Sequence, residues 1–148
     1  MPSNTLYIEN VDIGDEVPEL VTTVSMDQVT AFFASYPRSN NSPDRPSRFN
    51  SDAQAKKEGL AGPIIPGVMS MALITKVLTD WGIGAKFKLL DAIFRQVVPQ
   101  EEQIRAYAVI TDKDEDSNTI ELDVYIEPID GQPYVRGRAS MELVSKNG

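Results

Sequence analysis

The stretch GPIIPGVMSMALITKVLTDW, residues 62–81, decides how this chain folds. From Pro66 to Trp81 its apolar residues cover almost the whole circumference of a helix, and only Lys76 and Asp80 are charged, one turn apart on one face. A helix as apolar as this is predicted to be buried rather than to lie on the surface. The glycines that follow, at 82 and 84, are expected to end it.

Beyond this helix the sequence indicates β-strands separated by polar turns. The expected strands are residues 86–98, 104–110, 119–129 and 134–144. In the third of them, alternate apolar residues from Ile120 to Ile126 share one face, which is typical of a half-buried antiparallel strand. A buried helix followed by a run of antiparallel strands predicts an α+β fold, with the sheet wrapped around the helix, in a single domain spanning 1–148.

The N-terminal part begins with an extended segment, broken at Gly14 and Pro18, and continues into a helix and a loop. Ser25 opens the helix, with Gln28 completing a capping box. Residues 37–50 are rich in proline, serine and asparagine and are expected to form a loop. A short helix is expected at Ser51–Glu58, capped by its serine.

Composition excludes several classes of function. The 148 residues include no histidine and no cysteine, so a histidine base and a zinc site are not expected, and neither is any other metal or cofactor. The net charge of −8 argues against a nucleic-acid partner, which needs a basic surface. No apolar run is long enough to span a bilayer, and the first residues do not read as a signal peptide, so a cytoplasmic location is expected.

A Gly-Pro-rich step leads into the apolar helix, and a long antiparallel sheet is expected after it. In this order of elements the chain resembles the MaoC-like (R)-specific enoyl-CoA hydratases and dehydratases, which have the hotdog fold. The segment FRQVVPQEEQI, residues 94–104, is similar to the strand–turn–strand step of that family, with Gln100 and Glu101 in place of its usual Gly-Asp. The resemblance covers nearly the whole chain and implies an acyl-thioester or related small-molecule substrate.

The resemblance also places functional residues. In the family an Asp, a His and an oxyanion-hole Gly follow one another at fixed spacing. Here the glycine falls on Gly67, at the start of the apolar helix; counting back at that spacing, the Asp falls on Asp44 and the His position on Phe49. The Asn-Pro pair of the family motif is absent, because Pro46 and Ser47 stand there. The implied catalytic residues are Asp44 and Gly67, without a histidine.

Each of these residues also has an ordinary structural interpretation. The N–H of Gly67, after Pro66 at a helix N-terminus, is suited to bind a thioester carbonyl, but the glycine could equally serve a tight helix start. Asp44 could act as a lone acid or base, or simply pair with a neighbouring arginine. Phe49 could line a pocket or pack beneath the loop.

The remaining substrate-binding candidates are polar residues at the expected pocket mouth and cations for phosphate groups, with solvated loop charges as the simpler alternative. They are Tyr36, Asn40, Arg45 and Arg48.

Three functions stay open at this point. The first is a hydratase or dehydratase-type lyase that works without histidine. The second is a non-catalytic or half-site subunit of a heteromeric hotdog hydratase, in which a partner chain supplies the missing base. The third is a hotdog protein recruited to another reaction, such as a cyclisation. A homodimer is expected, or pairing with a second hotdog chain, because the edge of the sheet needs a partner.

Overall fold

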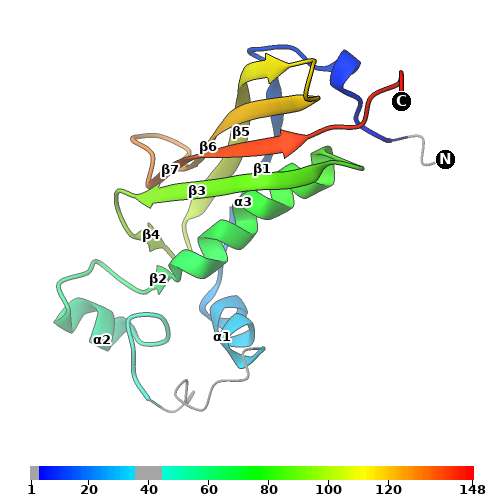
Figure 1. Ribbon diagram of the computed structural model, residues 1–148. Helices are drawn as coiled ribbons and strands as arrows, with labels where there is room; N and C mark the ends of the chain where they lie inside the picture. The colour runs from blue at the N-terminus through cyan, green and yellow to red at the C-terminus, as the bar shows by residue number, and fades with distance from the viewer. Residues whose placement is uncertain (1–3, 36–44) are drawn as a thin grey trace.

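The computed structural model describes residues 4–35 and 45–148 (Figure 1). The strands are β1 (Glu16–Thr23), β2 (Ile64–Ile65), β3 (Lys86–Phe94), β4 (Val98–Pro99), β5 (Gln103–Asp114), β6 (Thr119–Pro128) and β7 (Val135–Glu142). The helices are the single 3-10 turn η1 (Ile8–Asn10), α1 (Met26–Ala34), α2 (Asp52–Lys57) and α3 (Gly67–Trp81).

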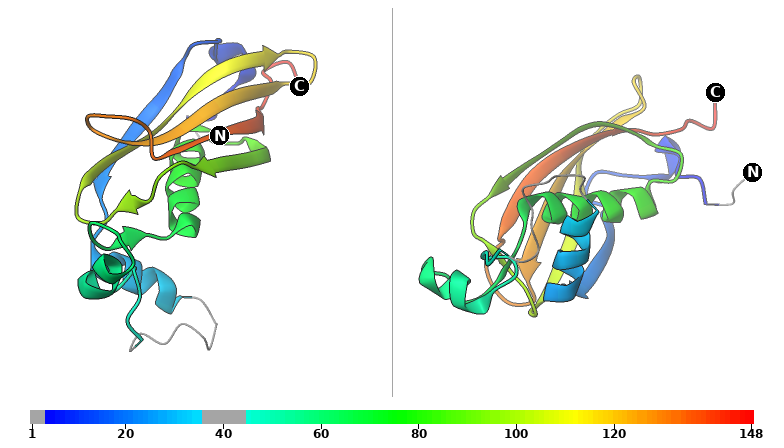
Figure 2. Two further views of the ribbon diagram at one scale, coloured as in Figure 1. Left: turned by 90° about the vertical axis from the view of Figure 1, so that its left-hand side faces the viewer. Right: turned by 90° about the horizontal axis from the view of Figure 1, so that it is seen from below.

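The main sheet is antiparallel and curves around one helix. Its strands lie in the order β1-β5-β6-β7-β3, and β2 and β4 form a separate pair at one end. Helix α3 packs against β1, β5 and β6 on the concave side, as the two views of Figure 2 show. The predicted α+β architecture, a sheet wrapped around the apolar helix, is therefore confirmed.

The core lies between α3 and the inward-facing residues of the sheet. Along β5 and β6 buried side chains alternate with half-exposed ones, so one face of each strand points at the helix. The largest buried side chains of this core are Ile74, Leu78, Ile104, Ile110, Ile120, Leu122, Ile126 and Met141.

Local signals set most of the element boundaries. The capping box of Ser25 and Gln28 is present at the start of α1, and the side chain of Ser51 caps α2. Strand β5 runs on to Asp114, so the turn before β6 is shorter than expected. Strand β1 continues through Pro18 with a shift of register, which an edge strand tolerates because one row of its N–H groups has no partner.

The prediction that α3 is buried on all sides is wrong for the single chain. Only Ser70, Ile74, Val77 and Leu78 are buried, whereas Val68 is 59% exposed. The reason is geometric, because the five strands of one chain cover only one side of the helix. The apolar residues on its other side remain partly open.

Strands β3 and β7 approach each other closely at Gly137. A Cβ built on this glycine would overlap the carbonyl oxygen of Asp91 and lie 2.8 Å from the Cα of Ala92. Both are backbone atoms of β3, which is paired with β7 here and cannot shift without losing its ladder. Gly137 therefore permits the edge strand β3 to join the sheet.

We expect Gly137→Ala to lower the free energy of unfolding by about 2–3 kcal/mol, because the added methyl group forces β3 away from β7. Urea denaturation measures this. Gly62→Ala is the matched control, since its Cβ would find only ordinary contact, 3.7 Å from Asp52. Equal stability of the two variants would contradict the assigned role of Gly137.

Candidate functional site

The candidate site lies where α3 begins, at the end of the molecule that also carries α1, α2, β2 and β4 (Figure 1). Four segments meet around this helix N-terminus. They are the loop at residues 45–51, the β2 strand, the turn between β4 and β5, and helix α1.

The loop at residues 45–51 is held in a tight turn by its own side chains. The Oδ1 of Asn50 accepts from the N–H of Ser47 at 2.7 Å, and its Nδ2 donates to the carbonyl of Arg45 at 3.0 Å. The Oγ of Ser47 accepts from the N–H of Phe49 at 3.2 Å. Residues of this kind favour turns because they bond to nearby backbone, and here they set the direction of Phe49.

Phe49 packs inward against α1. Its ring centroid lies 5.3 Å from that of Phe33, and both rings pack against the hydrophobic core. This separation lies in the range in which contact between two aromatic rings stabilises a fold. The residue that stands in the histidine position of the resemblance thus has a packing role, and its ring carries no group that transfers a proton.

The two described arginines of the loop differ in their surroundings. The guanidinium of Arg48 lies 2.8 Å from the carboxylate of Glu58 at the end of α2, with both side chains partly exposed. Arg45 is exposed. An exposed ion pair of this kind contributes about 0–1 kcal/mol, so Arg48 can exchange Glu58 for an anionic ligand at small cost.

Pro66 and Gly67 start α3 as predicted. Pro66 is buried and caps the helix, and its carbonyl accepts from the N–H groups of Met69 and Ser70 at 3.0 and 3.1 Å. Gly67 is exposed, and among the described residues its N–H meets no acceptor. An unpaired N–H at a helix N-terminus is a suitable donor to a carbonyl or anionic oxygen.

A phenylalanine of the edge strand covers one side of Gly67. A Cβ built on the glycine would lie 3.3 Å from the Cζ of Phe94 and 3.5 Å from its Cε1. The ring of Phe94 is 48% exposed, so it has room to move. The glycine thus serves close packing at this position, where a larger residue would press on the ring of Phe94.

The turn between β4 and β5 contacts the site through Gln100. This side chain is 5% exposed, and its Nε2 donates to the carbonyls of Phe49 and Ile64, both at 2.8 Å. Its Oε1 has no donor among the described residues. A buried Gln with two such bonds links the loop to β2.

The next residue, Glu101, links the same turn to α1. Its backbone has φ 63°, which is uncommon for a residue with a side chain. Its N–H donates to the carbonyl of Val24 at 2.9 Å, and its Oε1 accepts from the N–H of Met26 at 3.0 Å. These two bonds offset the strained backbone and place a carboxylate at the N-terminus of α1, where negative charge is favoured.

Three of the predicted site residues lie outside the described residues. They are Tyr36, Asn40 and Asp44. The described ones, Arg45, Arg48, Phe49, Pro66 and Gly67, all belong to the loop or to the helix start.

Sequence reasoning missed the part that Gln100, Phe94 and Ser70 play here. Gln100 stood out only as a departure from the resembled turn. Ser70 is a polar residue in an otherwise apolar part of α3; it is fully buried, and its Oγ has no partner among the described residues. That contrast was the one local signal available for it. Phe94 gave none, because its contact with Gly67 joins distant parts of the chain.

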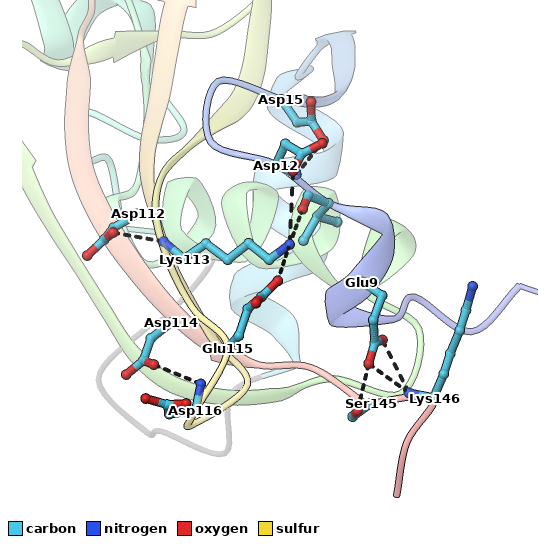
Figure 3. Close-up of polar contacts among 11 residues, drawn as sticks. Glu9, Asp12, Asp15, Asp112, Lys113, Asp114, Glu115, Asp116, Ser145 and Lys146 are labelled. Carbon is cyan, nitrogen blue, oxygen red and sulfur yellow. Dashed lines mark hydrogen bonds and ion pairs between the residues drawn. The ribbon is translucent and has the colours of Figure 1, made fainter.

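A cluster of acidic residues occupies the opposite end of the sheet. Figure 3 shows Lys113 reaching across it, where its Nζ lies 3.3 Å from Glu115 and 4.0 Å from Asp12 and donates to the carbonyl of Val11 at 2.8 Å. Nearby, a hydrogen bond from Ser145 lowers the pKa of Glu9. Among residues 4–35 and 45–148 no three acidic side chains are placed to hold a metal ion. The cluster ties the termini and the β5–β6 turn together.

Comparison with solved structures identifies the fold as the hotdog fold. The structure of the R-hydratase PhaJ1 from Pseudomonas aeruginosa matches with a TM-score of 0.79 and 18% identity, over 96% of this chain and 88% of that one. The (R)-hydratase from A. caviae involved in PHA biosynthesis matches with a TM-score of 0.76 and 22% identity, over 91% and 98% of the two chains. The ChsH1-ChsH2 complex from Mycobacterium tuberculosis matches with a TM-score of 0.74 and 15% identity, over 89% and 98%.

The profile of the MaoC like domain matches residues 50–131, which is more than half of the chain. The protein therefore belongs to the MaoC-like family, and the resemblance seen in its sequence is confirmed. No match was found among the curated proteins. In the part of the chain that the structure describes, no helix is long and apolar enough to cross a membrane.

The contact between Gly67 and Phe94 can be tested by stability. We expect Gly67→Ala to cost about 1 kcal/mol or less, because the half-exposed ring can give way. In a Phe94→Leu background the same change should be neutral or stabilising, since alanine favours helices over glycine. Urea denaturation of the four proteins measures the coupling. An equal cost in both backgrounds would show that Phe94 is not what Gly67 accommodates.

Proposed function

We propose that this protein is a hydratase or dehydratase-type lyase that acts on an acyl thioester or a related small unsaturated substrate without a catalytic histidine. The observation that carries the proposal is that Gly67 starts the central helix of a MaoC-like domain, is an exposed residue, and has an N–H with no acceptor among the described residues. A donor in this place can bind a thioester carbonyl and stabilise the enolate that forms from it.

The proposed chemistry uses one carboxylate for two proton steps. Asp44 takes a proton from water as the water oxygen bonds to the β-carbon of the unsaturated thioester, and the electron pair of the double bond moves onto the carbonyl oxygen at Gly67. The enolate then collapses, and Asp44 returns the proton to the α-carbon. Dehydration is the same sequence reversed. Proton transfer of this kind contributes about 10²–10⁴-fold to a rate.

The arginines supply the second part of the proposal. Arg45 and Arg48 lie on the loop beside the helix start, and a thioester of coenzyme A or of a carrier protein carries phosphate at the far end of its pantetheine arm. Arginine binds phosphate well because its guanidinium donates two parallel hydrogen bonds. Tyr36 and Asn40 are proposed as polar contacts at the mouth of the same site.

A second candidate function is a half-site subunit whose partner chain supplies the base. It is favoured by Phe49, because the resemblance expects histidine at this residue and its ring packs against Phe33. It is compatible with the comparisons, since one matching structure is a complex of two different chains, ChsH1 and ChsH2.

A second hotdog chain is essential only to the half-site function, but the edge strand β3 offers a surface for one in either case. Apolar side chains that are 40% exposed or more lie along and just after this strand; they are Phe87, Leu89, Ile93, Phe94 and Val97. An open sheet edge with apolar side chains is avoided in monomers because it invites association. We propose that this edge pairs with a second copy of the chain.

The catalytic role of Asp44 predicts a large loss of activity in Asp44→Asn, which keeps the shape and removes the base. Hydration of crotonyl-CoA and longer enoyl-CoAs should fall by about two to four orders of magnitude. Asp52→Asn, in the exposed first turn of α2, is the control and should keep wild-type rates. Activity that survives Asp44→Asn would rule out this assignment. A wild type that is inactive alone but active with a histidine-bearing hotdog chain would favour the half-site function.

The dimer is predicted to depend on Ile93, which is 55% exposed on β3. Light scattering of the wild type should give twice the 16.3 kDa of one chain, and Ile93→Lys should shift it toward the monomer because a buried lysine charge is costly. Ile129→Lys is the matched control, at an isoleucine that is 56% exposed in the turn before β7. A wild type that stays monomeric at micromolar concentration would contradict the proposed pairing.

A further inference from the structure

Gln100 contacts three backbone carbonyls on two separate segments of the site. Its N–H donates to the carbonyl of Pro63 at 3.0 Å, and its side-chain Nε2 donates to those of Phe49 and Ile64, both at 2.8 Å. At 5% exposure, water does not compete strongly for these bonds. One buried residue therefore connects the loop at residues 45–51 to the segment that leads into α3.

The chemistry of these contacts requires a primary amide. Both side-chain partners are carbonyl oxygens, which only accept, so the NH₂ end of Gln100 must face them and both its N–H groups are used. The N–H of Ile64 donates to the carbonyl of Arg48, so both polar backbone groups of Ile64 face the loop rather than β4. The side chain of Gln100 supplies the donor for the carbonyl of Ile64 on this side.

The two segments that Gln100 joins form two sides of the candidate site. One is the loop that carries Phe49. In this loop the backbone carbonyl of Arg48 accepts from the N–H of Ile64 at 3.1 Å. The other reaches Pro66 and Gly67 two and three residues after Ile64. The separation between the loop and the N–H of Gly67 is thus set by a single side-chain amide together with one backbone bond.

Glu101 continues the same connection to α1. Its bonds to Val24 and Met26 hold the N-terminus of the helix that carries Phe33, and Phe33 packs against Phe49. The β4–β5 turn therefore holds the loop twice, directly through Gln100 and indirectly through α1. A shift of this turn would therefore move the loop at residues 45–51, strand β2 and helix α1, which all lie near the start of α3.

We propose that Gln100 is a positioning residue of the lyase, which holds the loop at residues 45–51 at the working distance from the N–H of Gly67. The inference rests on the proposed function for its effect on turnover, and on the hydrogen bonds alone for its effect on the loop. It acts through the backbone and touches no substrate. A misplacement of about 1 Å in an active site can cost about 10²-fold in rate.

The test uses Gln100→Glu, which has the same shape but only accepts hydrogen bonds, and Gln100→Leu, which neither donates nor accepts. Gln96→Glu and Gln96→Leu are the matched controls at an exposed glutamine just before β4. Hydrogen exchange measured by mass spectrometry follows residues 45–51, 62–70 and, as a reference for the intact sheet, 119–128. Kinetics of crotonyl-CoA hydration give kcat and KM separately.

In both Gln100 variants we expect exchange of residues 45–51 and 62–70 to rise by at least about tenfold, with 119–128 unchanged, because a local opening raises exchange only where it occurs. The kcat should fall by about 10–100-fold because the bound geometry is disturbed, and KM should rise by a smaller factor because the loop also carries Arg45 and Arg48. The Gln96 variants should match the wild type in both measurements.

Three results would overturn the inference. Unchanged exchange in the Gln100 variants would show that the loop does not depend on this amide. Faster hydrogen exchange in residues 45–51 and 62–70 with an unchanged kcat would show that Gln100 holds the loop but does not position it for catalysis. A Glu variant that behaves like the wild type would show that bulk, rather than donation, is what matters.

Two further measurements keep the test decisive. If the wild type hydrates no enoyl-CoA, the proposed function fails. The hydrogen-exchange measurement then decides by itself whether Gln100 holds the loop. If the variants do not fold, NMR of the wild type decides instead. The side-chain N–H protons of Gln100 should then exchange at least about tenfold more slowly than those of Gln96, and equal rates would refute the hydrogen bonds.

Discussion

Burial of α3 against the concave face of the sheet is the constraint on which the rest of this structure depends. The helix contributes Ile74, Val77 and Leu78 to the core, and β1, β5 and β6 close over them. Removing this apolar surface from water provides the main driving force for the fold. Because the sheet follows the length of the helix, the helix N-terminus is left at one end of it, where N–H groups without helical partners can meet other segments.

The position of that N-terminus is fixed by hydrogen bonds rather than by further apolar packing. The β2–β4 pair is only two residues long on each strand and holds little by itself. Gln100 and Glu101 add bonds to the loop, to β2 and to α1, and the left-handed backbone of Glu101 is tolerated because two of these bonds depend on it. A site built in this way is held accurately, but it is sensitive to single side chains.

Local patterns were sufficient to predict α3, the two capped helices and most of the strands, because caps and apolar periodicity act over a few residues. The contacts that shape the site join residues far apart in the sequence, such as Gln100 with Phe49 and Phe94 with Gly67, and no local pattern reports them. The exposed side of α3 was misjudged for a related reason. Periodicity shows that a face is apolar, but it does not show which chain covers it.

The packing of Phe49 against Phe33 bears directly on the chemistry that this site can support. Two proton-transfer groups can work on opposite faces of a double bond, whereas a single carboxylate reaches only one. In the proposed lyase, Asp44 would deliver to the α-carbon the proton that it took from water, so the hydroxyl group and the hydrogen must arrive on the same face of the substrate. Because the ring of Phe49 carries no proton-transfer group, the proposed reaction is a syn addition or elimination, in which the N–H of Gly67 stabilises the enolate between the two proton steps.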